Sequence, residues 1–326
     1  MARKPRIHLL ATGGTIAGQS QSPDDTIHYT AGALSVKELL GSACSLAEIS
    51  AIRGEDFCHM GSEDMTPQIW QKLGRRLRAI SADPATEGIV VTHGTDTMAE
   101  TAFFLQMTCP TPKPIVLTGA MRPATAPNAD GPQNLRDALL VASAKEAAAY
   151  GVTAVMNGEI FSAAHLRKNH SSKLSAFSSA PKQRLGHIQQ QRIFWEQAPA
   201  PLHPRFASAL TEALPEVAIL TAYAGMTAEL PKSLFNLGIH NLIFDGFGNG
   251  TLPRPVVEIL TAAQGIFIVT GQTGHGTVVS HYPNLLAGGF CTAKQARILC
   301  MLALATGANR QEIAVLLRKI SEKLVK

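Results

Sequence analysis

The feature that most constrains the fold is a series of short apolar runs spread along the chain. Most are apolar throughout rather than alternating, which is typical of strands covered on both faces of a parallel sheet. The segments between them carry helical spacing, and this alternation predicts an α/β fold with a mostly parallel sheet flanked by helices. The expected strands are 7–12, 88–93, 114–119, 152–157, 217–223, 241–248 and 265–271, and the expected helices are 66–80, 97–107, 132–149, 232–237, 253–264, 293–306 and 310–325.

The domain organisation follows from length and from the prolines. At about 150 residues per domain, a chain of 326 residues is expected to form two domains. Residues 198–215 hold four prolines and no strand pattern, so we interpret them as a linker. The sequence therefore predicts a larger N-terminal α/β domain over 1–197 and a smaller C-terminal α/β domain over 216–326.

Composition excludes several classes of protein. With 45% hydrophobic and 16% charged residues, intrinsic disorder is excluded, because so apolar a chain can offset its ordering entropy by burial. The net charge of +5 raises the question of nucleic acid. The basic residues are scattered, however, and only 182–192 and 318–326 approach a basic stripe, so we interpret both as solvated faces and expect no nucleic-acid partner.

Compartment and metal chemistry are constrained by what the sequence lacks. The sequence contains no run of about 18 apolar residues, so we expect no membrane helix. The apolar run near the N-terminus is too short for a signal peptide. The histidines show no HExxH pattern, so we expect no metal and no cofactor. The sequence has five cysteines, Cys44, Cys58, Cys109, Cys291 and Cys300. Their odd number and the lack of a CxxC spacing favour free, mostly buried thiols and a cytoplasmic protein.

The first candidate motif is ATGGTIAG, residues 11–18, directly after the first expected strand. Paired glycines there let the backbone approach a ligand, and Thr15 would project a hydroxyl into the cleft. A plain tight turn is the alternative, and the glycine spacing does not fit a nucleotide-binding loop. The polar residues 18–31 that follow are a candidate mobile lid.

The second candidate motif is VTHGTDTMAE, residues 91–100, where another strand meets a helix. Thr97 and Glu100 fit a capping box, which leaves Thr95 and Asp96 without a structural role. Such turns meet at the same edge of a parallel sheet, so we expect this motif beside the first. We expect His93 to be a structural strand end rather than a general base.

The third candidate motif is GSEDM, residues 61–65, followed by Thr66 and Pro67. Thr66 is expected to cap a helix that has Pro67 at its first position. Ser62 and Asp64 could be ordinary turn and cap residues. Alternatively, a hydroxyl beside carboxylates is the combination that binds a zwitterionic amino acid.

These segments resemble a known family. ATGGTIAG and VVTHGTDTMAETA are similar to the two signature segments of the bacterial-type L-asparaginases and glutaminase-asparaginases, and GSEDM, TGAMRP and ADGPQNL occur in the family's order. The resemblance runs from about residue 7 to about residue 305. It implies an amidohydrolase that converts L-asparagine to L-aspartate and ammonia through an acyl-enzyme, with L-glutamine as a second candidate substrate.

The resemblance implies roles for the catalytic residues. Thr15 would be the nucleophile, Tyr29 on the lid would polarise it or relay its proton, and Thr95, Asp96 and Lys168 would form a second cluster. A threonine hydroxyl is a weak nucleophile that needs a base, which a desolvated amine could supply. From the residues alone, an ordinary surface lysine remains the alternative for Lys168.

Substrate contacts are implied in the same way. Ser62, Glu63 and Asp96 would hold the α-carboxylate and α-ammonium, and the Ala120 carbonyl would accept a hydrogen bond from the amide nitrogen. Backbone N–H groups around Gly14 and Thr95 could stabilise the oxyanion. The resemblance also implies a homotetramer or homodimer.

The sequence departs from the family pattern at several positions. Glu63 stands where many secreted members have Gln, and residues 277–290 contain no carboxylate where those members have a glutamate that reaches the neighbouring subunit. Gly225 replaces an expected asparagine, and the disulfide partner of Cys109 in some secreted members falls near Pro84. Two alternatives remain: the amide-hydrolysing subunit of a tRNA-dependent amidotransferase, and a non-catalytic amino-acid-binding homologue.

Overall fold

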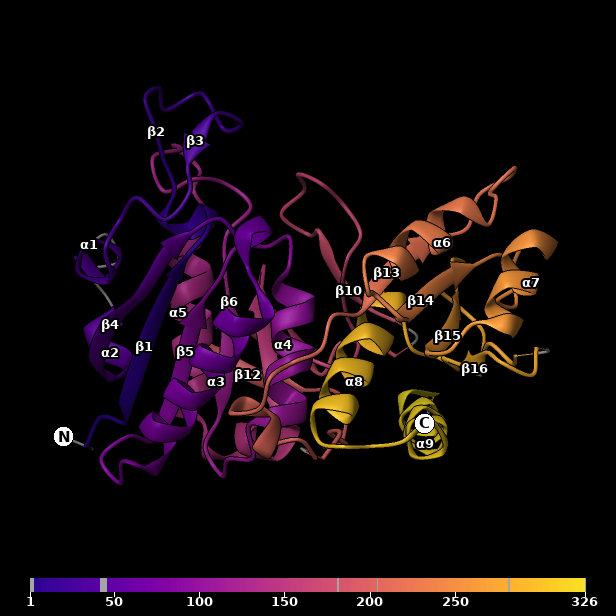
Figure 1. The fold of residues 1–326 in the computed structure, drawn as a ribbon. Helices are drawn as coiled ribbons and strands as arrows, with labels where there is room; N and C mark the ends of the chain where they lie inside the picture. Colours follow the sequence, from indigo (N-terminus) through magenta and orange to yellow (C-terminus); the bar gives the residue numbers. More distant parts are fainter. Residues whose placement is uncertain (1–2, 42–45, 181, 204, 281, 326) are drawn as a thin grey trace. The chain divides into compact units, whose positions relative to one another are not determined.

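The computed structural model describes residues 3–41, 46–180, 182–203, 205–280 and 282–325. The chain divides into two units, Met1–Leu210 and Thr211–Lys326. Figure 1 shows the strands and helices alternating along both of them, which confirms the predicted α/β class.

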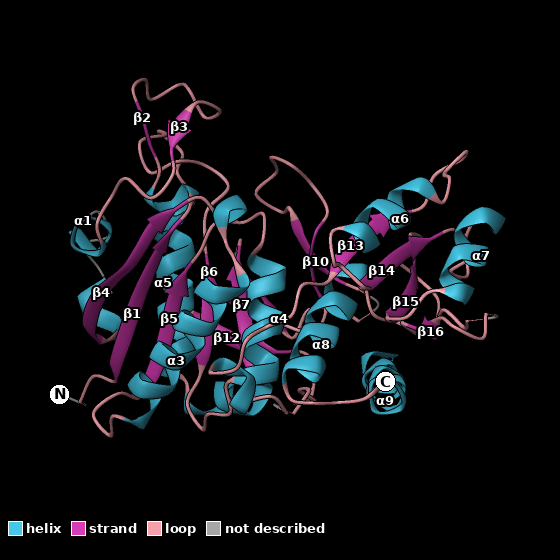
Figure 2. Cartoon of the chain, viewed as in Figure 1, coloured by secondary structure: helices cyan, strands magenta, loops and turns pink. Residues whose placement is uncertain are grey.

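The first unit is built on an eight-stranded sheet in the order β12-β11-β8-β7-β6-β5-β1-β4 (Figure 2). The strands from β4 to β7 are parallel, and the strands at the other end are antiparallel. The central strands β5, β6 and β7 are buried at every position, as their apolar sequences predict. The strands are β1 (Arg6–Gly13), β4 (Ala51–Met60), β5 (Gly88–Thr92), β6 (Ile115–Thr118), β7 (Val152–Met156), β8 (Glu159–Ser162), β11 (Gly186–Gln189) and β12 (Arg192–Trp195).

Helices cover both faces of this sheet (Figure 2). Leu135 and Leu139 of α5 share one apolar cluster with Leu9 of β1 and Val90 of β5, while α3 and α4 lie on the other face. The remaining elements of the unit are short and lie around the sheet. The bounds are α1 (Val36–Gly41), α2 (Leu46–Ile49), α3 (Pro67–Ala82), α4 (Met98–Thr108), α5 (Gly131–Ser143), the 3-10 helices Thr15–Ala17, Ser62–Asp64, Lys145–Tyr150 and Ser208–Leu210, and the strand pairs β2 (Gln19–Ser20) with β3 (Tyr29–Thr30) and β9 (Leu166–Lys168) with β10 (Phe177–Ser179).

The second unit contains a four-stranded parallel sheet in the order β13-β14-β15-β16. Its core is apolar, and Phe244 and Phe267 are fully buried in it. Thr292 and Gln295 form a capping box at the start of α8. The elements are β13 (Ala218–Thr221), α6 (Glu229–Asn236), β14 (Asn241–Gly246), α7 (Arg254–Ala262), β15 (Ile266–Gly271), β16 (Leu286–Ala287), α8 (Ala293–Ala305) and α9 (Arg310–Val325).

One predicted helix ends earlier than expected. The expected helix 132–149 ends at Ser143 and is followed by the 3-10 helix Lys145–Tyr150. The Tyr150 ring stacks on Trp195 with 4.0 Å between centroids, and its hydroxyl donates to the Gln197 carbonyl. This packing overrides the helical propensity of an alanine-rich segment.

No helix in the described part of the chain is long and apolar enough to span a membrane. Four cysteines, Cys58, Cys109, Cys291 and Cys300, are free thiols, and all but Cys58 are buried, as expected. Cys44 lies outside the described residues.

Candidate active site

The two glycine-containing turns lie against each other at the carboxyl ends of β1 and β5, which are neighbouring parallel strands. Gly14 has φ of +79°, and a Cβ built on it would lie 2.5 Å from the Gly94 Cα. Any side chain at position 14 would therefore displace the second turn. This close approach of two backbones places the residues that follow, Thr15 and Thr95, at one edge of the sheet, as the two motifs predict.

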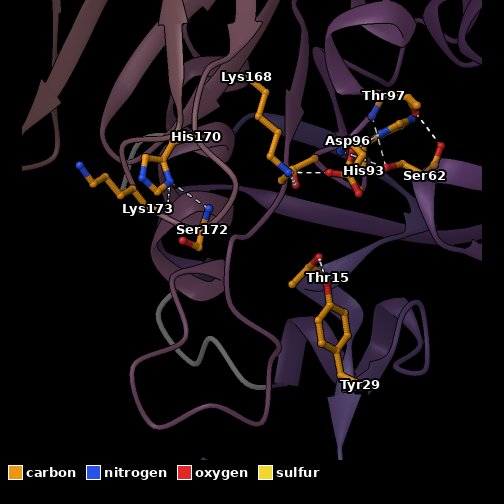
Figure 3. Close-up of polar contacts among 12 residues, drawn as sticks. Thr15, Tyr29, Ser62, His93, Asp96, Thr97, Lys168, His170, Ser172 and Lys173 are labelled. Atoms are coloured by element: carbon orange, nitrogen blue, oxygen red, sulfur yellow. Dashed lines mark hydrogen bonds and ion pairs between the residues drawn. The ribbon is translucent and has the colours of Figure 1, made fainter. Parts of the chain in front are cut away.

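Thr15 and Tyr29 form the first hydroxyl pair. Thr15 begins a 3-10 helix and is only 8% exposed, and its Oγ1 lies 2.7 Å from the Tyr29 phenol oxygen. Gly18 leaves space for the ring, because a Cβ there would lie 2.7 Å from Tyr29 Cδ2. Figure 3 shows the two hydroxyl groups directed at each other. Tyr29 reaches Thr15 from β3, within the segment predicted to be a lid.

Lys168, Thr95 and Asp96 form the second cluster. The Lys168 Nζ donates to Thr95 Oγ1 at 2.8 Å and to Asp96 Oδ1 at 2.6 Å. The lysine side chain is 19% exposed, whereas that of Asp96 is 63% exposed. Figure 3 shows Lys168 extending from β9 toward the turn after β5. An amine is thereby held beside a threonine hydroxyl, an arrangement in which the two can exchange a proton.

Ser62 connects the third motif to the second through hydrogen bonds. Its Oγ accepts hydrogen bonds from the backbone N–H of Asp96, at 3.1 Å, and of Thr97, at 3.4 Å. The Thr97 hydroxyl donates to the Ser62 carbonyl at 2.7 Å (Figure 3). Thr97 makes no side-chain cap bond in α4, so the predicted capping box is wrong. The reason is that Ser62, from another segment, supplies the oxygen at this helix start.

Glu63 and Ala120 are placed differently from the other candidates. Glu63 is exposed, and its carboxylate folds back against Gly61. Ala120 is fully buried just after β6. A Cβ on the preceding Gly119 would lie 3.5 Å from Thr95 Cγ2, so this backbone borders the second cluster.

The ADGPQNL segment holds the backbone around Ala120, a role that its sequence did not reveal. The Asp130 carboxylate accepts the N–H groups of Met121 and Arg122, both at 2.9 Å. Asn134 donates to the Gly119 carbonyl at 3.0 Å. The signal was present in the quoted motif, but spacing alone does not show which backbone atoms a side chain will reach.

His93 has a structural environment. It is fully buried, and its Nδ1 lies 2.7 Å from the Gly94 carbonyl, which can only accept a hydrogen bond. Its Nε2 therefore accepts the Thr101 hydroxyl at 3.0 Å, while that hydroxyl accepts the Trp70 indole N–H. Burial lowers the pKa of His93 to about 4. Both ring nitrogens are used, which agrees with the expected structural role.

The Gly14 N–H is not among the free amides around the first turn. It donates to the Met60 carbonyl at 2.8 Å, so the parallel pairing of β1 with β4 uses this group. The amides of Thr15 and Thr95 are the candidate oxyanion donors at this edge. Within the described ranges, no three His, Cys, Asp or Glu side chains converge in a way that could hold a metal ion.

Comparisons with known families cover nearly the whole chain. Residues 6–201 match the family described as "Asparaginase, N-terminal", and residues 216–317 match the "Glutaminase/Asparaginase C-terminal domain". Together the two matches span both units of the fold.

Individual relatives agree with the family matches. The chain is 36% identical to the "Probable L-asparaginase periplasmic" of Haemophilus influenzae, over 92% of this chain and 88% of that protein. It is 34% identical to the "Glutaminase-asparaginase" of Pseudomonas fluorescens, over 94% and 88%. The crystal structure of a probable cytoplasmic L-asparaginase from Campylobacter jejuni superposes with a TM-score of 0.87 at 32% identity, covering 99% of this chain and 100% of that one. The chain therefore belongs to the L-asparaginase family.

Proposed function

We propose that this protein hydrolyses L-asparagine to L-aspartate and ammonia through an acyl-enzyme on Thr15. The observation that carries the proposal is the pair of threonine hydroxyls at one sheet edge, each bonded to a different proton-transfer group: Thr15 to Tyr29, and Thr95 to Lys168. Nucleophilic catalysis needs a hydroxyl with a neighbouring group that takes up its proton. The names of the relatives support asparagine as the substrate.

In the first half of the reaction, Thr15 Oγ1 attacks the side-chain amide carbon while its proton passes to the Tyr29 oxygen, and the phenol gives up its own proton toward the amide nitrogen. The amide C–N bond then breaks as the nitrogen takes up this proton, and ammonia leaves. In the second half, water attacks the Thr15 ester with Thr95 and Lys168 transferring protons, and aspartate is released with the Thr15 hydroxyl restored. The amides of Thr15 and Thr95 would stabilise both oxyanions.

Recognition of the amino-acid part of the substrate is assigned to the second and third motifs. Ser62 Oγ accepts two backbone N–H groups, which leaves its own hydrogen for the α-carboxylate. The exposed Asp96 carboxylate and Glu63 would hold the α-ammonium. The Ala120 carbonyl would orient the side-chain amide.

The decisive variant is Lys168→Met, which keeps the length of the side chain and removes the amine. Turnover should fall by at least about a hundredfold, the range expected when a positioned proton-transfer group is lost. Lys173→Met is the matched control, because Lys173 is exposed on the loop after β9. Equal turnover in the two variants would contradict the proposal.

L-Glutamine is a second candidate substrate, and a relative named glutaminase-asparaginase supports it. A broad-specificity enzyme would show comparable kcat/KM for both amino acids. A non-catalytic amino-acid-binding homologue would bind either one without releasing ammonia. Calorimetry beside an ammonia assay separates these cases.

The resemblance also supports a cytoplasmic homotetramer or homodimer. One relative is described as cytoplasmic, although another is named periplasmic. Because 277–290 lacks a carboxylate and Gly225 replaces an asparagine, the family's contact from the neighbouring subunit is absent or replaced. Light scattering coupled to size-exclusion chromatography tests the assembly, and a monomer that retains full activity would contradict it.

A further inference from the structure

We propose that Thr125 and Ser20 are positioning residues that dock the hairpin carrying Tyr29 onto the loop after β6. The inference deepens the proposed function and rests on it, because it explains how Tyr29 is held at Thr15. The hairpin is formed by β2 and β3, and Figure 1 shows it projecting beyond the carboxyl ends of the main sheet.

The hydrogen bonds between the two residues form a network with defined donors. The Ser20 hydroxyl donates to the Ser22 carbonyl at 2.6 Å, so its hydrogen is already used. Thr125 must therefore donate to Ser20 Oγ, at 2.9 Å, while Thr125 Oγ1 accepts the Ser20 N–H at 3.1 Å. One threonine hydroxyl thus bonds the hairpin twice, through a side chain and through the backbone.

The pairing of the hairpin transmits this contact to the reacting hydroxyl. Ser20 on β2 is directly opposite Tyr29 on β3, and Tyr29 is bonded to Thr15. The contacts therefore run from Thr125 through Ser20 and Tyr29 to Thr15. A shift of Ser20 would shift Tyr29 with it, because opposite residues in a strand pair share backbone hydrogen bonds or close side chains.

The two partners of the contact differ in how firmly they are held. The loop of Thr125 is fixed by the bonds of Asp130 to the N–H groups of Met121 and Arg122. No side chain in 19–31 is fully buried, and Ile27 is 78% exposed. A segment with so little buried apolar surface has low local stability. The position of this segment therefore depends largely on its polar contacts with the loop after β6.

A further bond lies beside the same site. The Ala124 N–H donates to the Gly18 carbonyl at 2.9 Å, at the residue where the chain leaves the catalytic turn and enters the hairpin. The loop after β6 thus receives the hairpin at two successive residues. This loop also contains Ala120, whose carbonyl is proposed to contact the side-chain amide of the substrate. The same loop would therefore position both that carbonyl and the hairpin that contains Tyr29.

The test uses Thr125→Val, which keeps the shape of the side chain and removes both bonds, with Thr125→Ser as the rescue variant. Ser20→Ala should have a smaller effect, since it keeps the bond from the Ser20 N–H. Thr26→Val is the matched control, because Thr26 is exposed on the same hairpin. The measurements are hydrogen exchange of residues 18–31, the melting temperature, and kcat and KM for L-asparagine.

In Thr125→Val, exchange within 18–31 should accelerate about three- to tenfold, as expected for the loss of one or two hydrogen bonds. The melting temperature should stay unchanged, kcat/KM should fall by a similar factor, and Thr125→Ser should restore both. Unchanged exchange would overturn the docking, and faster exchange with unchanged kcat/KM would overturn its catalytic importance. Absence of asparaginase activity in the unmodified enzyme would instead overturn the proposed function, while hydrogen exchange would still decide the docking.

Discussion

Thr15 and Thr95 are hydrogen-bonded to different partners, Tyr29 and Lys168, and the proposed mechanism gives them different proton transfers. Thr15→Ala and Thr95→Val should each lower turnover by at least about a thousandfold while leaving the fold intact. The double variant should lose little more than the worse single variant, because residues that act in one reaction are not additive. Ammonia release and a melting curve test this, and near-normal release with an unchanged melting curve in either single variant would contradict the mechanism.

Glu63 is the residue at which specificity is expected to differ from the secreted relatives. Glu63→Gln removes an exposed charge, so the KM for L-asparagine should rise about two- to fivefold, as expected for an exposed charge contact. The ratio of kcat/KM for L-glutamine to that for L-asparagine should change with it. Asp64→Asn, at the exposed neighbour, should leave that ratio as it is. An equal ratio in Glu63→Gln and the unmodified enzyme would place specificity elsewhere.

Asp137 gives the fold a pH dependence that is separate from catalysis. The residue is 4% exposed, and burial raises the pKa of its carboxyl to about 6, although Gln133 donates a hydrogen bond to it. A raised folded-state pKa means that its contribution to stability is present below the unfolded value of about 4 and is lost as the pH rises through about 6. Asp137→Asn should therefore stabilise the protein by about 2 kcal/mol at pH 8 and by little at pH 4.

Denaturant unfolding at the two pH values measures this difference. Asp130→Asn is not a suitable control, because Asp130 supports the active-site loop. Glu258→Gln is suitable, since Glu258 is an exposed helix residue paired with Arg254. If Asp137→Asn changed stability equally at pH 4 and pH 8, the ionised carboxyl would not be the cause.

At the scale of the elements, the contact of the two strand-end turns requires glycine. Gly14→Ala would place a side chain at φ of +79° and against the Gly94 backbone, so we expect a loss of more than about 2 kcal/mol of stability together with loss of activity. Gly41→Ala is the control, because a Cβ there meets nothing within 4 Å. Equal stability of the two variants, measured by denaturant unfolding, would contradict the required close approach.

The sequence predicted the strands with long apolar runs and missed the strands without them. Strands β5, β6 and β7 are fully buried and were predicted to within a residue or two. Strand β4 was missed, because every one of its positions is exposed or half-buried and because the charged or polar residues Arg53, Glu55, Asp56 and His59 interrupt its apolar ones. Its parallel pairing with β1 is a tertiary contact, which local propensity does not contain.

Site residues that directly follow a strand could be predicted from the sequence. Site residues that come from segments distant in the sequence could not. Thr15, Thr95 and Asp96 stand at strand ends, so their meeting follows from the parallel sheet. Lys168 reaches Thr95 across 73 positions of sequence, and only the family resemblance selected it. Thr125 was not selected at all, because its partner lies 105 positions away.

At the scale of the whole molecule, the protein's own carboxylates pair with one member of a basic stretch in the sequence. In the stretch 182–192, Arg184 pairs with Glu159 and Glu196. Its charge is thereby largely offset by carboxylates of the protein itself. A small-molecule substrate, rather than nucleic acid, remains the expected partner.

The most direct test of the central claim is ammonia release by the unmodified protein with L-asparagine, L-glutamine and D-asparagine in parallel, using Thr15→Ala as the blank. We expect rapid release from L-asparagine and none above background in Thr15→Ala. Comparable release from L-glutamine would widen the substrate range without changing the mechanism. Binding of L-asparagine with no ammonia released, or equal release by Thr15→Ala, would contradict asparagine hydrolysis by a Thr15 nucleophile.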